Sequence, residues 1–156
     1  MNKQAINLSV NQVINYHPQG QDHFNIEAKG NYIQLSTYDK ITYTDHQDDD
    51  IEIKWQYSPN RYDIQQLEIR QSQGTLVFSQ NTPTHNPYVT AQGTWDLIIE
   101  TKTMQLKEVD NESYLQLTYL MRLGEEKLGD YDFQLIFCPQ EGNINSRGKE
   151  VPNGIE

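Results

Sequence analysis

The chain of 156 residues carries 12 basic and 22 acidic side chains, a formal net charge of −10. This balance repels phosphate polymers and anionic membrane surfaces, so we expect neither nucleic acid nor a membrane as a partner. The length fits one domain that buries its own core without metal or disulfide staples. A single cysteine, Cys138, excludes an intrachain disulfide and fits a reducing compartment.

The N-terminus lacks the continuous apolar segment of a secretory signal, and no stretch reaches the length of a membrane span. We therefore expect a cytoplasmic protein.

The first half of the chain repeats the alternation of apolar and polar residues that is typical of half-buried strands. Residues 4–16 form the first such run, which ends at a turn with proline and glycine. Further runs follow at 24–30, more weakly at 31–38, then at 41–43, 51–57, 62–70 and 76–78. An acidic turn at 45–50 and a loop with two prolines at 80–87 separate some of them.

The clearest strand of the second half follows a compact turn at 91–93. Trp95, Leu97 and Ile99 alternate there with polar residues, so we expect Trp95 to be buried. Runs at 104–106, 115–122 and 131–137 follow, separated by turns. Because no apolar stripe with helical spacing persists, many short strands indicate an all-β sandwich or barrel. Parallel βαβ architecture is excluded, since nothing forms its crossover helices.

The chain divides at its last apolar strand. Residues 1–138 are expected to form a single β-barrel domain. Residues 139–156 are polar, rich in glycine and asparagine, and without period, which predicts a flexible tail.

The residue types that carry catalysis or bind metals show no supporting motif. The four histidines lack the paired spacing of a metal site, and the acidic turn at 45–50 lacks the ligand pattern of an EF-hand. Cys138 has no neighbouring base in any motif, so a packed thiol is favoured over a nucleophile. We therefore expect no metal, no cofactor and no catalytic residue.

Arginine and aromatic residues are the candidates for ligand binding. Arg70 lies opposite Leu67 and Ile69 in parity, on a face that is either solvent or a polar lumen. An arginine there can hold a ligand carboxylate, although a surface arginine is the favoured interpretation. Likewise, ordinary core packing is favoured over a ligand cage for the aromatic residues. The candidate ligand-binding residues are Trp55, Tyr57, Arg70, Tyr88, Thr90 and Tyr119.

Several short segments together resemble the YwiB-like family of small bacterial β-barrel proteins. They include Ile51-Glu-Ile-Lys54, Leu67-Glu-Ile-Arg70 and Tyr88-x-Thr90-x-x-Gly93 followed by the apolar strand to Thr101. The family turn Thr-Pro-Tyr-Gly reads Thr90-Ala-Gln-Gly93 here, and the glycine of Arg-x-Gly is replaced by Ser72. The resemblance implies a closed or nearly closed antiparallel barrel of about eight to ten strands, similar to calycins and lipocalins. It implies cytoplasmic residence and brings no activity.

A barrel of about eight strands is just wide enough to be filled by side chains or to hold one small ligand. Our first hypothesis is a non-enzymatic binding module for an amphipathic or fatty-acid-like ligand. The alternative is a protein–protein interaction or structural module with a side-chain-filled barrel. An enzyme acting at the barrel mouth is the weakest alternative. A homodimer is a further hypothesis, with Ile98, Leu120 and Ile136 as a candidate outer apolar patch.

Overall fold

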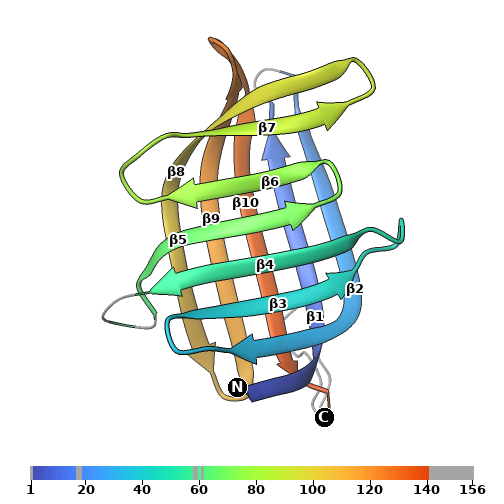
Figure 1. Cartoon of the computed structure of the whole chain (residues 1–156), viewed down its shortest axis with the longest axis vertical. Coiled ribbons are helices and arrows are strands. Elements are labelled where there is room, and N and C mark those ends of the chain that lie inside the picture. Colours follow the sequence, from blue (N-terminus) through green and yellow to red (C-terminus); the bar gives the residue numbers. More distant parts are fainter. Residues whose placement is uncertain (1, 17–18, 58–59, 61, 141–156) are drawn as a thin grey trace.

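The computed structural model describes residues 2–16, 19–57, 60 and 62–140. These residues form ten strands in one closed antiparallel barrel (Figure 1). The prediction of an all-β antiparallel barrel is confirmed. The strands are β1 (Asn2–Asn15), β2 (Gln21–Gln34), β3 (Tyr38–Thr44), β4 (Asp50–Tyr57), β5 (Ile64–Gln71), β6 (Gly74–Ser79), β7 (Thr84–Thr90), β8 (Gly93–Val109), β9 (Glu112–Leu123) and β10 (Glu126–Pro139).

Strands that follow one another in the chain lie next to one another in the barrel, and β1 pairs with β10 to close it. This meander needs only short turns between strands, which matches the turn signals at close spacing in the sequence. Figure 1 shows β3 to β7 running across the front while β1, β9 and β10 run lengthwise behind them. Each strand therefore has a paired neighbour on both sides, although β2 pairs with β3 only over Gly30–Gln34.

Bulges let two long strands bend around the barrel without losing their apolar face. In β8 the register shifts between Thr101 and Thr103, so the buried side chains change from odd to even positions. Leu97 and Ile99 are therefore buried before the bulge, and Met104 and Leu106 after it. What the sequence presents as two separate apolar runs is one continuous strand of 17 residues.

Figure 1 shows β2 bending from the back of the barrel to the front. Gly30, opposite Tyr43, is the first residue of β2 that pairs with β3. A Cβ atom at this position would overlap the backbone oxygen of Thr42 on β3 and approach Leu8 Cδ2 to 3.2 Å. Only a residue without a side chain allows this close approach.

One end of the barrel, where β1 begins, is filled by side chains. Trp55 is fully buried, and its ring lies 6.3 Å, centroid to centroid, from those of Tyr32 and Phe137. The buried carboxylate of Asp39 accepts hydrogen bonds from the hydroxyls of Tyr32 at 2.5 Å and Tyr57 at 3.3 Å. These donors compensate for removing the carboxylate from water. The filled end is therefore a packed core in which the Asp39 carboxylate has donors, whereas the buried Nε1 of Trp55 has no hydrogen-bond partner among the described residues.

The predicted tail at 139–156 lies outside the described residues except for Pro139 and Gln140. Within the part of the chain that the structure describes, no helix is long and apolar enough to cross a membrane.

Candidate functional site: a half-hollow barrel lumen

The other half of the barrel is hollow. It holds a cavity of about 570 Å³ to which all ten strands contribute lining side chains. Most of these are apolar: Val10, Ile14, Phe24, Ile26, Ile51, Ile69, Leu76, Trp95, Leu97, Met121, Leu128 and Phe133. The volume lies within the range of about 300–1,000 Å³ found for small-molecule pockets.

Tyr119 forms part of the cavity wall where hollow and filled halves meet. Its ring stacks on Tyr131 with centroids 4.8 Å apart and meets the buried ring of Phe78 edge-on at 4.7 Å. Its hydroxyl accepts a hydrogen bond of 3.0 Å from Gln12 Nε2 on β1, which lies on the other side of β10. Packing on two sides and one polar contact fix the ring, so this wall is preformed rather than assembled by a ligand.

Four tyrosines, at positions 43, 88, 119 and 131, bring hydroxyl groups to the lining. Burial is the main cause that raises the pKa of each phenol, to about 12 for Tyr43. Nearby carboxylates add to the effect, Asp45 at Tyr43 and Asp49 at Tyr88. All four hydroxyls therefore stay protonated at neutral pH. The hydroxyl of Tyr88 donates to Gln73 Oε1 at 2.9 Å, and those of Tyr43, Tyr119 and Tyr131 can donate hydrogen bonds into the lumen.

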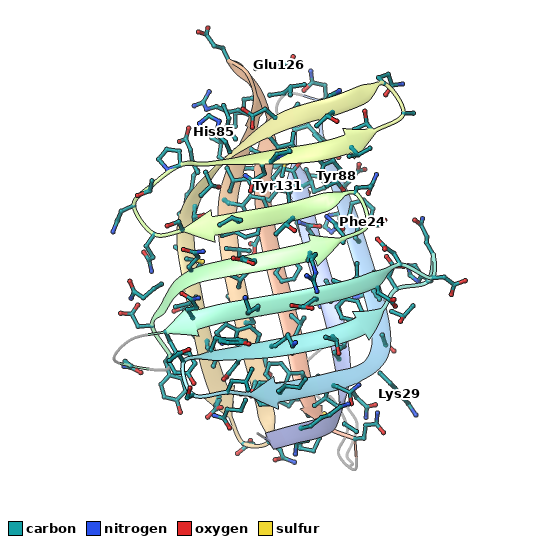
Figure 2. All side chains as sticks on the ribbon, viewed as in Figure 1. Phe24, Lys29, His85, Tyr88, Glu126 and Tyr131 are labelled. Atoms are coloured by element: carbon teal, nitrogen blue, oxygen red, sulfur yellow. The ribbon has the colours of Figure 1, made fainter. Side chains whose placement is uncertain are left out.

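The mouth of the cavity lies at the end of the barrel away from the start of β1. Phe24 is 51% exposed and Trp95 is 36% exposed, and both line the cavity. Tyr88 and Tyr131 also line the cavity, and Figure 2 labels both in the upper part of the barrel. Thr90, also in the lining, uses its hydroxyl in the β7–β8 turn, where it donates to the Gly93 carbonyl at 2.8 Å. The exposed aromatic rings surround an entrance rather than close a core.

Neither lysine nor arginine is among the described residues that line the cavity. Its charged lining residue is Asp45, in the β3–β4 turn beside His46 and Gln47. One carboxylate oxygen of Asp45 already accepts the backbone N–H groups of Gln47 at 2.9 Å and Asp49 at 3.0 Å. That carboxylate therefore stabilises the turn, and the acidic loop behaves as the hairpin turn expected from the sequence.

Three of the six candidate ligand-binding residues, Tyr88, Thr90 and Tyr119, line the cavity. Trp55 and Tyr57 are instead in the filled end, where they pack around Asp39. Arg70 is exposed on the outer face and pairs with Glu52 at 2.5 Å, which agrees with the favoured interpretation of a surface arginine and not with a ligand-binding role in the lumen. Because Ile69 and Gln71 face the lumen, Arg70 between them must face solvent.

The expectation that Trp95 is buried is wrong, although its parity is right. The side chain points to the inside of the barrel but lies at the open mouth. The sequence reasoning also missed Gln12 and Gln71, which face the lumen. Gln12 carries a usable signal, because it interrupts the inward apolar series of Val10 and Ile14 with a polar side chain. A bulge between Lys127 and Gly129 places Leu128 in the lining as well, and the sequence gives no sign of it.

A comparison with protein families identifies the family of this chain. A family model described as "Domain of unknown function (DUF1934)" matches residues 8–135. The chain belongs to the DUF1934 family. No curated protein matches it. The resemblance to a YwiB-like family of unknown function, predicted from sequence, is confirmed.

One solved structure has a similar fold. It is described as "Crystal structure of ywiB protein from Bacillus subtilis", and the two structures superpose with a TM-score of 0.70. The match covers 88% of this chain and 92% of that one, at 17% sequence identity. At this identity the similarity establishes the fold alone. The role of this DUF1934 member must therefore be inferred from its own lumen.

Proposed function

We propose that the protein is a non-enzymatic binding module that holds a small, largely apolar ligand in the open half of its barrel. The cavity of about 570 Å³ carries this proposal. A barrel built only as a structural module would fill both ends, because an empty apolar volume costs stability. Here one end is packed around the fully buried Trp55, and the other is hollow and open.

The lining supports binding more than catalysis. Apolar side chains and neutral phenol hydroxyls dominate it, which is typical of sites that enclose and orient a small molecule. The aromatic rings at the mouth offer contact area while keeping the entrance accessible. A cytoplasmic location and the likeness to lipocalins stay predictions.

A fluorescent titration tests the proposal. N-phenyl-1-naphthylamine is an uncharged probe that brightens in apolar surroundings, so we expect saturable binding to the native protein. Leu97→Trp places a larger side chain in the lumen, and we expect at least about tenfold weaker binding because the ligand volume is lost.

Ile98→Trp is the matched control, because Ile98 is the next residue of β8 and does not line the cavity. It should bind the probe as the native protein does. Absence of binding to the native protein, or equal affinity in all three proteins, would overturn the proposal. Circular dichroism of each variant confirms that it is folded. Native mass spectrometry of protein purified from its own host then gives the mass of the natural ligand.

A further inference from the structure

We infer that the lumen selects an uncharged ligand that presents a hydrogen-bond acceptor, and that it discriminates against carboxylates and other anions. This inference rests on the proposed function and names the ligand class for the same site. It departs from the fatty-acid-like ligand of the sequence-based hypothesis, because Arg70, the one candidate partner for a carboxylate, lies outside the barrel.

The charges of the lining provide the first argument. The described lining residues include one carboxylate, Asp45, one histidine, His46, and no lysine or arginine. An anion moved into this cavity would lose its hydration and find no cationic partner, a cost of several kcal/mol for a buried charge. Asp45 at the mouth and the net charge of −10 add repulsion.

A cation has no favourable place in the lumen either. Asp45 lies at the rim, in the turn that its carboxylate stabilises through Gln47 and Asp49. The other polar lining groups are the phenols, the His46 imidazole, the Thr90 hydroxyl and the amides of Gln12, Gln47 and Gln71. None of these groups carries the full negative charge that compensates a desolvated ammonium group.

The tyrosine hydroxyls provide the second argument. Tyr119 accepts the hydrogen bond of Gln12, and among the described residues its own proton has no acceptor. The same holds for the hydroxyl protons of Tyr43 and Tyr131. A neutral carbonyl, ether or hydroxyl oxygen on an otherwise apolar ligand would accept these protons and satisfy the phenols.

Competition between three molecules with the same alkyl chain tests the charge preference. 1-Decanol, decanoate and decyltrimethylammonium are titrated at neutral pH against bound N-phenyl-1-naphthylamine. We expect 1-decanol to displace the probe about 100-fold more effectively than either ion, as the burial cost of an unpaired charge requires. Displacement by either ion at a concentration similar to that of 1-decanol would overturn the inference while leaving the binding function intact. If the probe itself does not bind, the proposed function fails.

Two adjacent residues of β5 make a matched pair of variants. Gln71→Arg places a cation in the lumen and should strengthen decanoate binding about tenfold or more, by supplying the missing partner. Arg70→Gln removes the outer arginine and should leave decanoate binding unchanged. A loss of decanoate binding in Arg70→Gln would show that the outer arginine holds anions, which contradicts the inference.

Removing one phenol hydroxyl tests the acceptor requirement. Tyr131→Phe keeps the ring stacked on Tyr119 and deletes the donor. We expect 1-decanol to bind about threefold to tenfold more weakly, the worth of one neutral hydrogen bond. The affinity for 1-decanol is also measured for Tyr119→Phe, which removes the hydroxyl donor of Tyr119. Unchanged 1-decanol affinity in both variants would show that the hydroxyls do not contact the ligand.

Discussion

Asn86 Oδ1 accepts a hydrogen bond of 2.8 Å from the backbone N–H of Val77. A side chain on β7 thus replaces a backbone carbonyl as the hydrogen-bond acceptor for β6. The ladder between β6 and β7 holds a single residue pair, Gly74 with Tyr88. The amide nitrogen of Asn86 also donates to the Leu97 carbonyl on β8 at 3.0 Å. One buried asparagine thus bridges three strands beside the lumen.

Asn86→Ala should destabilise the protein by about 2–4 kcal/mol, because Val77 N–H and the Leu97 carbonyl both lose a buried partner. Urea unfolding measures this change. His85→Ala is the control, because His85 is the preceding residue of β7 and forms an exposed pair with Asp96. We expect its removal to lower the free energy of unfolding by less than about 1 kcal/mol. Equal effects of the two substitutions would mean that the bridge contributes little.

Amide hydrogens of β7 should exchange faster than those of β9. β7 is bonded to β6 at one residue pair, whereas β9 pairs along its length with both β8 and β10. Segments with fewer backbone bonds open at lower free energy. Hydrogen exchange followed by mass spectrometry compares the two strands, and exchange in β7 as slow as in β9 would argue against a weak junction. Bound ligand should slow β7, since Tyr88 and Thr90 line the cavity.

The two tryptophans should respond differently to truncation. Trp55→Ala removes a fully buried side chain from the filled end and should cost about 3–5 kcal/mol. Trp95→Ala removes a ring that is 36% exposed at the mouth, and we expect about 1–2 kcal/mol together with weaker probe binding. Urea unfolding and the probe titration measure both effects. A cost for Trp95→Ala as large as that for Trp55→Ala would place Trp95 in the core.

Gly93→Ala tests the turn between β7 and β8. Gly93 adopts φ of +121°, a region that side chains rarely occupy, and nothing lies within 4 Å of an added Cβ. The cost is therefore backbone strain alone, about 1–2 kcal/mol. Gln92→Ala, at an exposed position of the same turn, should change stability by less than about 0.5 kcal/mol. A neutral Gly93→Ala variant would mean that the turn relaxes to another conformation.

Stability should fall as the pH rises above about 10, the pKa of a tyrosine in the unfolded chain. Burial raises the pKa of Tyr43 to about 12 in the folded state, so the unfolded chain releases its proton first. The stabilising contribution is thus complete below about pH 10 and is lost as the pH rises toward 12. Tyr43→Phe should flatten this decline in urea unfolding curves. An identical decline in the variant would show that other groups cause it.

The sequence was sufficient to predict which face of a strand points inward. Alternation placed Leu97, Ile99 and Tyr119 on inner faces, and the structure confirms them as buried. Alternation has no information about depth along the barrel axis, which is why Trp95 was expected to be buried and lies at the mouth. Alternation alone could not decide whether the face that carries Arg70 points to solvent or to the lumen. In the closed barrel this face points to solvent.

The hollow lumen itself was not predictable. It depends on which inward side chains of non-adjacent strands meet, such as Gln12 on β1 and Tyr119 on β9, which are 107 residues apart in the chain. The register between β1 and β10, together with the bulges in β8 and β10, determines which side chains come into contact. Long-range register has no local sequence signal when both strands alternate in the same way.

The most direct test of a ligand in the open half of the barrel is an NMR titration of the isotope-labelled protein with N-phenyl-1-naphthylamine. We predict that amide signals of lining residues such as Val10, Met121 and Tyr131 shift on binding, while those near Trp55 in the filled end stay unchanged. Shifts confined to the outer face or to the filled end, or no shifts at all, would contradict the account.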